Sequence, residues 1–122
     1  LHGSIWRVRC DREGWVKEDL SNGPLSRRKC VCGAWLRPDI IWFQDMLDEA
    51  TVREATNSIS TCDLFISIGT SAVVWPAAGY PNLAKSSGAF CIEINPEETE
   101  LSPLYDKCIR STASQGLNQL FE

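Results

Sequence analysis

Residues 62–75, CDLFISIGTSAVVW, decide the fold: an apolar run stops at Gly69, and two hydroxyl residues follow it. A short apolar run bounded by glycine is typical of a strand buried in a parallel sheet. Open α/β folds bind their ligands in the turns that follow such strands. Gly69 allows close backbone approach, while Thr70 and Ser71 offer hydroxyls and amides to ribose or phosphate oxygens. A turn that only reverses the chain is the alternative interpretation.

Strand-like and helix-like segments alternate on both sides of this stretch. Strands are expected at residues 5–9, 38–43, 64–68, 89–94 and 107–110, and helical segments at 46–60, 76–85 and 111–121. This alternation predicts an α/β fold with a Rossmann-like parallel sheet, incomplete in this chain. Asp45 is expected to cap the first helix. The default ligand site is then the carboxyl edge of the sheet, at the loops after Phe43, Ile68, Ile94 and Arg110.

Composition excludes several classes of protein. The chain has 122 residues, 43% of them hydrophobic and 23% charged, which suits one soluble domain. No run approaches the roughly 20 apolar residues that span a bilayer, so we expect no membrane partner and a cytoplasmic location. A net charge of −4 with scattered acids argues against direct nucleic-acid binding. The chain begins at Leu1 without Met, and we interpret it as a piece whose partner is the missing amino-terminal half of the same protein.

The six cysteines divide into two groups by their surroundings. Three lie in or beside apolar runs and are expected to act as small buried hydrophobes: Cys62, Cys91 and Cys108. Three lie in a polar stretch with too little apolar material for its own core: Cys10, Cys30 and Cys32. A metal is the expected staple for such a stretch in a reducing compartment. We therefore predict a small zinc-ribbon-like module at residues 10–36, inserted in a Rossmann-like NAD-binding portion at residues 1–9 and 37–122.

Four separate segments of the chain resemble the sirtuins, the NAD-dependent protein deacylases. They are LHGS at residues 1–4, LRPDIIWF at 36–43, GTS with Val74 and PAA at 69–78, and INPE at 94–97. Their order and spacing match as well, and the resemblance corresponds to the carboxyl-terminal half or more of a sirtuin. It implies an enzyme that transfers an acyl group from lysine to ADP-ribose and releases nicotinamide. The fragment alone is expected to be inactive.

The resemblance also implies roles for individual residues. His2 corresponds to the general base, and imidazole suits this role because its unperturbed pKa, near 6.5, leaves much of it neutral at cellular pH. The residues implied to bind the NAD cofactor are Gly69, Thr70, Ser71, Asn95, Pro96, Glu97 and Ala113. Within this set, Asn95 and Glu97 look like the residues that hold the adenosine ribose.

An acylated lysine peptide or protein is the implied substrate, bound as an added strand. The implied contacts are Ile41, Trp42, Phe43 and Asp45; the alternative is that the apolar members are core or edge residues. The Trp42-Phe43 pair resembles the sirtuin branch that prefers acidic acyl groups such as succinyl. The residues that select the acyl group in that branch precede the catalytic histidine, so this chain does not assign the acyl group.

Three positions depart from the family pattern. Sirtuins hold a structural zinc with two cysteine pairs, whereas here Glu13 stands in the second ligand position, which gives the ligand set Cys10, Glu13, Cys30 and Cys32. The alternative is a module that has lost its metal and relies on packing. Gln44 and Ser111 stand where the family usually has glycine. These departures leave two other functions open, a degenerate sirtuin that binds NAD or ADP-ribose and a protein ADP-ribosyltransferase.

Overall fold

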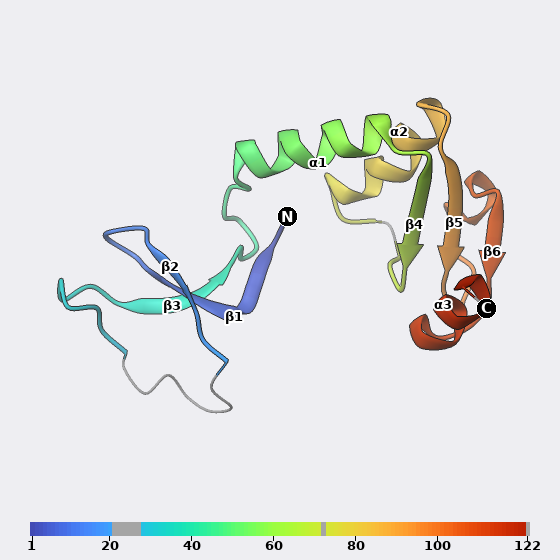
Figure 1. Ribbon diagram of the computed structural model, residues 1–122. Coiled ribbons are helices and arrows are strands. Elements are labelled where there is room, and N and C mark those ends of the chain that lie inside the picture. The colour runs from blue at the N-terminus through green and yellow to red at the C-terminus, as the bar shows by residue number, and fades with distance from the viewer. Residues whose placement is uncertain (21–27, 72, 122) are drawn as a thin grey trace. The chain divides into compact units, whose positions relative to one another are not determined.

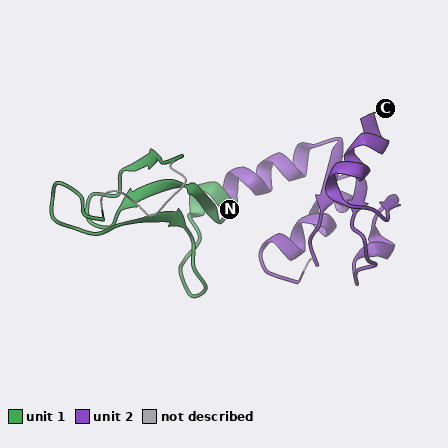
Figure 2. Ribbon diagram, turned by 90° about the horizontal axis from the view of Figure 1, so that it is seen from below, with its two compact units in different colours: residues 1–52 green, residues 53–122 purple. Residues whose placement is uncertain are grey.

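The computed structural model describes residues 1–20, 28–71 and 73–121. These form two compact units, Leu1–Val52 and Arg53–Glu122 (Figures 1 and 2). The second unit contains a parallel sheet and helices, so the predicted α/β fold class is confirmed. None of the helices in the described parts of the chain is long and apolar enough to cross a membrane.

The first unit is built on an antiparallel sheet with the order β2-β1-β3. Its strands are β1 (Gly3–Cys10), β2 (Val16–Glu18) and β3 (Leu36–Ile40). The β1–β3 register shifts between Ser4 and Val8. At the start of β1, Gly3 has φ of 79°, and a Cβ there would lie 2.0 Å from the Asp39 carbonyl oxygen. Only glycine allows β1 and β3 to approach this closely.

Few apolar side chains are buried in the first unit. Among its described residues, the buried hydrophobic ones are Val8, Cys10 and Cys30. Of these, only Cys10 and Cys30 lie in the described part of residues 10–36, as expected for a stretch with too little apolar material for its own core. Two of the three buried residues are thiols, so hydrophobic burial alone gives this unit little stability.

The second unit is built on a parallel sheet with the order β4-β5-β6. Its strands are β4 (Leu64–Ile68), β5 (Phe90–Ile94) and β6 (Lys107–Ile109), and their arrows point the same way in Figure 1. The helices are α1 (Glu49–Thr61), α2 (Tyr80–Ser86) and α3 (Ala113–Phe121), with 3-10 turns at Ala77–Gly79 and Ser102–Leu104. The carboxyl ends of all three strands therefore meet at one edge.

Buried apolar clusters cover both faces of this sheet. One cluster contains Ala84, Ala89, Cys91 and Tyr105, and the other contains Ile92, Ile94 and Ile109. Neighbouring residues of β5 belong to different clusters because side chains alternate along a strand. The central strand β5 is thus buried on both sides. The expectation of a buried strand at residues 64–68 needs correction, because β4 lies at the edge of the described sheet and Leu64 and Ile68 are 47% and 38% exposed. A Cβ on Gly116 of α3 would lie 2.3 Å from Ile94 Cγ2, so this helix requires glycine where it crosses β5.

Several boundaries differ from the sequence-based expectations around residues 40–48. The strand ends at Ile40 rather than Phe43, because a tight turn follows in which the Asp45 N–H donates to the Trp42 carbonyl at 3.0 Å. The expectation that Asp45 caps α1 is wrong. The cap is Asp48, whose Oδ2 accepts the Thr51 N–H at 2.7 Å, and the helix begins at Glu49.

Two further expectations need correction. The strand before Phe43 pairs with β1, so among the described residues the loop after it follows an antiparallel strand and not the parallel sheet. Cys108 is exposed, so its expected burial is wrong; a three-residue edge strand leaves it accessible. Cys91 is fully buried as expected, and Cys62 is partly buried against the same cluster.

Candidate functional site

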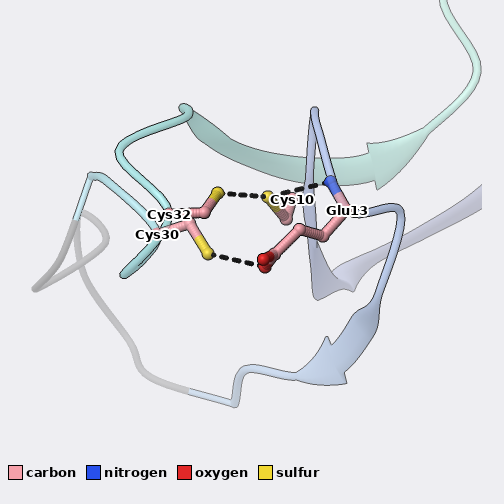
Figure 3. A group of neighbouring side chains, drawn as sticks. All are labelled: Cys10, Glu13, Cys30 and Cys32. Carbon is pink, nitrogen blue, oxygen red and sulfur yellow. Dashed lines mark hydrogen bonds between the residues drawn. The ribbon is translucent and has the colours of Figure 1, made fainter.

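Three thiols and one carboxylate gather at one end of the antiparallel sheet (Figure 3). The ligand atoms of Cys10, Glu13, Cys30 and Cys32 all lie within 4.8 Å of one another. The two sulfurs of Cys10 and Cys32 are 3.6 Å apart, and Cys30 Sγ is 3.3 Å from Glu13 Oε2. A tetrahedral zinc with Zn–S bonds of about 2.3 Å has sulfur–sulfur edges of roughly 3.8 Å. The donor set and its spacing therefore fit a tetrahedral zinc.

Two glycine turns carry these ligands. In the turn after β1, the Gly14 N–H donates to the Cys10 carbonyl at 3.0 Å; in the turn before β3, the Gly33 N–H donates to the Cys30 carbonyl at 3.0 Å. Both glycines have positive φ, 71° and 85°. The first turn also brings the Glu13 N–H to 3.4 Å from Cys10 Sγ. Each ligand pair thus comes from a short turn whose closing residue must adopt a left-handed conformation.

The protein surroundings act differently on two of the thiols. Burial raises the pKa of the Cys10 thiol, but hydrogen bonds from the Glu13 and Arg12 backbone and from the Cys32 and Cys30 side chains together outweigh it, so this pKa is lowered overall. The Cys32 backbone N–H lowers the pKa of the Cys30 thiol, but burial and the neighbouring side chains raise it to about 11. A metal bound here takes the place of thiol protons, so its binding releases protons.

Trp15, which is not itself a candidate ligand, contacts the Glu13 carboxylate of the cluster. Its indole Nε1–H donates to Glu13 Oε2 at 3.0 Å, the oxygen that also accepts from Cys30. Hydrogen bonds of this kind orient a ligand before the metal binds. Sequence reasoning missed Trp15; its place two residues after an unusual carboxylate ligand is the only local signal. Arg12 adds a second contact, from its Nη1 to the Cys32 carbonyl at 2.9 Å.

The candidate base and the candidate substrate segment lie together in the first unit. His2 is exposed immediately before β1, and its carbonyl accepts the Ile41 N–H at 3.0 Å. Trp42 and Phe43 are 56% and 93% exposed, so neither is a core residue of the described chain; the alternative that they are edge residues stays open. Ile41 is half-buried, and the Asp45 carboxylate accepts the Trp42 N–H at 3.3 Å. The candidate substrate segment therefore lies on the surface of this unit.

Three loops are tied together at the carboxyl edge of the parallel sheet. The Gly69 N–H donates to the Ile94 carbonyl at 2.9 Å, and the Asn95 N–H donates to the Ile109 carbonyl at 3.1 Å. Asn95 Nδ2 donates to the Thr70 carbonyl at 3.0 Å. Gly69 has φ of 61°, and a Cβ built there meets no atom within 4 Å. Its requirement for glycine is thus conformational, and the space in front of it is open.

The other expected cofactor residues lie on these same loops. Glu97 donates its N–H to Asn95 Oδ1 at 3.3 Å, which folds the loop after β5 back on itself. Ser71, Pro96 and Glu97 are exposed, and Ala113 is the first residue of α3. All seven expected cofactor residues belong to the second unit, whereas His2 belongs to the first. That His2 and the turn at residues 69–71 act on the same NAD molecule stays a prediction.

The parallel sheet with its loops at the carboxyl edge, and the cluster of three thiols and a carboxylate, belong to a family that the comparison with known proteins identifies. The model of the Sir2 family matches residues 1–76, and the chain belongs to this family. It is 42% identical to an "NAD-dependent protein deacylase" of Mycobacterium tuberculosis, with all of this chain and 54% of that protein covered. The chain spans about half the length of the curated relatives it matches.

Solved structures of Sir2 proteins agree with this assignment. A Sir2 homolog in complex with NAD matches with a TM-score of 0.89 and 39% identity over 98% of this chain and 48% of that one. A Sir2 protein with a p53 peptide and NAD+ matches with a TM-score of 0.80 and 25% identity over 99% of this chain and 52% of that one. The similarity therefore extends over both units of the chain, each of which has its counterpart in these proteins.

Proposed function

We propose that this chain is the carboxyl-terminal portion of an NAD-dependent protein lysine deacylase, a transferase that moves an acyl group from lysine to ADP-ribose and releases nicotinamide. The observation that carries the proposal is the joined set of loops at Gly69, Thr70 and Asn95, on the edge where α/β folds bind nucleotides. The relative named as a deacylase and the solved NAD complex support the same activity.

The roles of the residues follow from their chemistry. Bound NAD supplies an electrophilic ribose carbon when its bond to nicotinamide breaks. The exposed imidazole of His2 accepts a proton from a ribose hydroxyl. The open backbone at Gly69 allows the cofactor to approach closely. Glu97 and Asn95 pair with the vicinal hydroxyls of the adenosine ribose, and the carboxylate disfavours a phosphorylated ribose by charge repulsion.

The acylated peptide or protein substrate binds along Ile41–Phe43 as an added strand. Support comes from the end of β3 at Ile40, which leaves the next residues outside the sheet, and from their exposure. The solved Sir2 structure with a p53 peptide supports peptide binding in the family. The missing amino-terminal half of the protein completes the cofactor site, so we expect the isolated 122-residue chain to release no nicotinamide.

The zinc role in this proposal is structural. All four candidate ligands are consumed by a tetrahedral site, which leaves none for a reacting molecule. We assign residues 10–36 to the metal module and residues 1–9 and 37–122 to the Rossmann-like portion. A cytoplasmic location is supported by the thiols outside the metal set, those of Cys62, Cys91 and Cys108, because free thiols persist in reducing compartments.

The test uses the protein that comprises this chain and the residues before Leu1, with His2→Tyr compared against Glu18→Gln, an exposed change in the same unit. Nicotinamide release and deacylated peptide are measured by mass spectrometry, and NAD affinity by calorimetry. We expect His2→Tyr to lose about a thousandfold or more in turnover while NAD affinity changes less than about threefold. Undiminished turnover would remove His2 as the base.

The same assay separates the two alternatives. Gln44 at φ of 80° beside the substrate segment is the observation that favours a binding module. NAD or ADP-ribose binding without nicotinamide release from any of several acyl-peptides would establish that module in place of the enzyme. A mass increase of one ADP-ribose on protein, without loss of an acyl group, would establish the ADP-ribosyltransferase.

A further inference from the structure

A buried carboxylate interrupts the apolar strand β5. Glu93 is 3% exposed, and its two oxygens accept three short hydrogen bonds. Oε1 accepts the Thr99 hydroxyl at 2.6 Å, while Oε2 accepts the Ser102 hydroxyl at 2.6 Å and Arg110 Nη1 at 2.6 Å. A buried charge that is fully paired in this way escapes the large desolvation cost of an isolated one. Removing any one of the three donors would therefore leave part of the buried Glu93 charge without a partner.

The guanidinium of Arg110 joins two loops that sequence reasoning assigned to the cofactor. Besides Glu93, it donates from Nη2 to Ser102 Oγ at 2.9 Å and from Nη1 to the Glu97 carbonyl at 3.2 Å. Glu97 closes the loop after β5, and Arg110 directly precedes the loop at residues 111–113. Because the donors of arginine lie in one plane, a single side chain fixes the distance between these loops.

The Glu93 carboxylate remains ionised near neutral pH in this setting. Burial raises the pKa of Glu93. The hydroxyls of Ser102 and Thr99 and the Arg110 guanidinium lower it by more than burial raises it, so the pKa lies below its usual value. The Glu93 carboxylate in turn raises the pKa of Arg110. Both charges are thus retained where the loops meet, and the pair persists under assay conditions.

We propose that the Glu93–Arg110 pair is a clamp that sets the spacing of the 95–97 and 111–113 loops and thereby positions the adenosine end of the dinucleotide. The inference rests on the proposed NAD binding, and both members act as positioning residues without touching the cofactor. Loosening the clamp weakens ground-state binding and leaves the reacting end of NAD unchanged. The effect therefore falls on KM for NAD and not on kcat.

The test compares Arg110→Met and Arg110→Lys in the protein that includes the residues before Leu1. Lys85→Met is the matched control, because Lys85 forms a similar ion pair with Asp106. Asp106 precedes β6 at the amino ends of the strands, away from the loops at the carboxyl edge, and accepts the Cys91 N–H at 2.8 Å. We expect Arg110→Met to raise the NAD Kd and KM about tenfold with kcat within about twofold, and Arg110→Lys to fall between it and wild type. Lys85→Met should leave all three values unchanged.

Hydrogen exchange without NAD gives a readout that does not depend on the enzyme. Amides of residues 95–103 should exchange faster in Arg110→Met and Arg110→Lys than in wild type, and at the wild-type rate in Lys85→Met. If Arg110→Met fails to fold, the test rests on Arg110→Lys, because lysine keeps a positive charge that can pair with the Glu93 carboxylate.

The outcomes separate the clamp from the proposed function. Weaker NAD binding together with faster exchange in residues 95–103 supports the clamp. Wild-type affinity in both Arg110 variants overturns the clamp alone, and so does weaker binding with unchanged exchange, since Arg110 would then act by direct contact. A wild-type protein that binds no NAD overturns the proposed function and, with it, the cofactor role of the pair.

Discussion

The two units of this chain are held together by different physical means. In the described residues of 1–52, the buried hydrophobic side chains are Val8 and the two thiols Cys10 and Cys30, next to a set of metal-binding atoms. Residues 53–122 contain two apolar clusters, one on each face of a parallel sheet. Hydrophobic burial therefore accounts for the second unit, whereas the first has few buried apolar side chains and a set of atoms that could hold a metal. Changes that act on one mechanism should spare the other unit.

The largest expected effect is the loss of the metal. Cys10→Ser removes a buried ligand, and because structural zinc contributes roughly 10–16 kcal/mol in zinc-finger peptides, the first unit should unfold. Zinc content by elemental mass spectrometry should fall to background, and hydrogen exchange should accelerate in residues 1–52 only. Cys108→Ser, at an exposed thiol, is the control. A metal-free variant that keeps its protection would establish that packing holds this unit.

Two glycines of the first unit separate steric clash from backbone strain. Gly3→Ala places a Cβ 2.0 Å from the Asp39 carbonyl at a positive φ, whereas Gly14→Ala meets no atom within 4 Å at a similar φ. We expect Gly3→Ala to cost about 3 kcal/mol or more in free energy of unfolding and Gly14→Ala about 1 kcal/mol. Chemical denaturation followed by tryptophan fluorescence measures both. Equal costs would show that β1 shifts to accommodate the methyl group.

The second unit should carry an acid-sensitive step that originates in one buried carboxylate, Glu93. Because the folded-state pKa of Glu93 is depressed, its ionised form stabilises the fold above the unfolded-state pKa, and this contribution is lost as pH falls through the folded-state pKa. Glu93→Gln should cost about 2 kcal/mol at pH 7, and its difference from wild type should shrink on acidification. Melting temperature against pH measures this. A Glu93→Gln curve parallel to wild type, or a similar loss in the exposed Glu100→Gln, would contradict it.

Helix α3 tests the packing of the second unit more gently. In Gly116→Ala, the new methyl group meets Ile94 Cγ2 at 2.3 Å, and an isoleucine branch has little freedom to move. Overpacking costs about 1–3 kcal/mol, of which up to about 1 kcal/mol is offset by the better helix propensity of alanine. The control is Ser114→Ala on the exposed side of the same helix. A stabilised Gly116→Ala would mean that α3 moves away from β5 at little cost.

The smallest effect concerns Gln44 in the turn after β3. Its φ of 80° is strained for a residue with a side chain, so Gln44→Gly should raise the free energy of unfolding by about 0.5 kcal/mol, the strain relieved minus the added chain entropy. The free energy of unfolding of Gln44→Asn should fall between those of wild type and Gln44→Gly, because asparagine tolerates this conformation. Denaturant midpoints measured on all three proteins give the order. Any loss of stability in Gln44→Gly would show that the Gln44 side chain makes a compensating contact.

Local pattern was sufficient for the strands of the parallel sheet in the second unit. The strand Leu64–Ile68 was predicted to the residue because its apolar run is bounded by Asp63 and by Gly69. The three cysteine ligands were predicted from residue type and surroundings, and Glu13 from the family resemblance; the structure brings all four together. The end of β3 was missed because Trp42 and Phe43 have high strand propensity, yet the turn hydrogen bond from Asp45 to Trp42 prevails.

Sequence alone determined the fold class, most of the strands and helices though not β2, the Sir2 resemblance and the side chains available for chemistry. Alternation and spacing are local properties that burial imposes on a chain. Tertiary structure decided which of those side chains meet. The bond from Asn95 to Thr70, the bond from Trp15 to Glu13 and the pairing of Glu93 with Arg110 depend on how turns close and strands order themselves. A buried charge finds its partner only when the sheet that excludes water has formed around it.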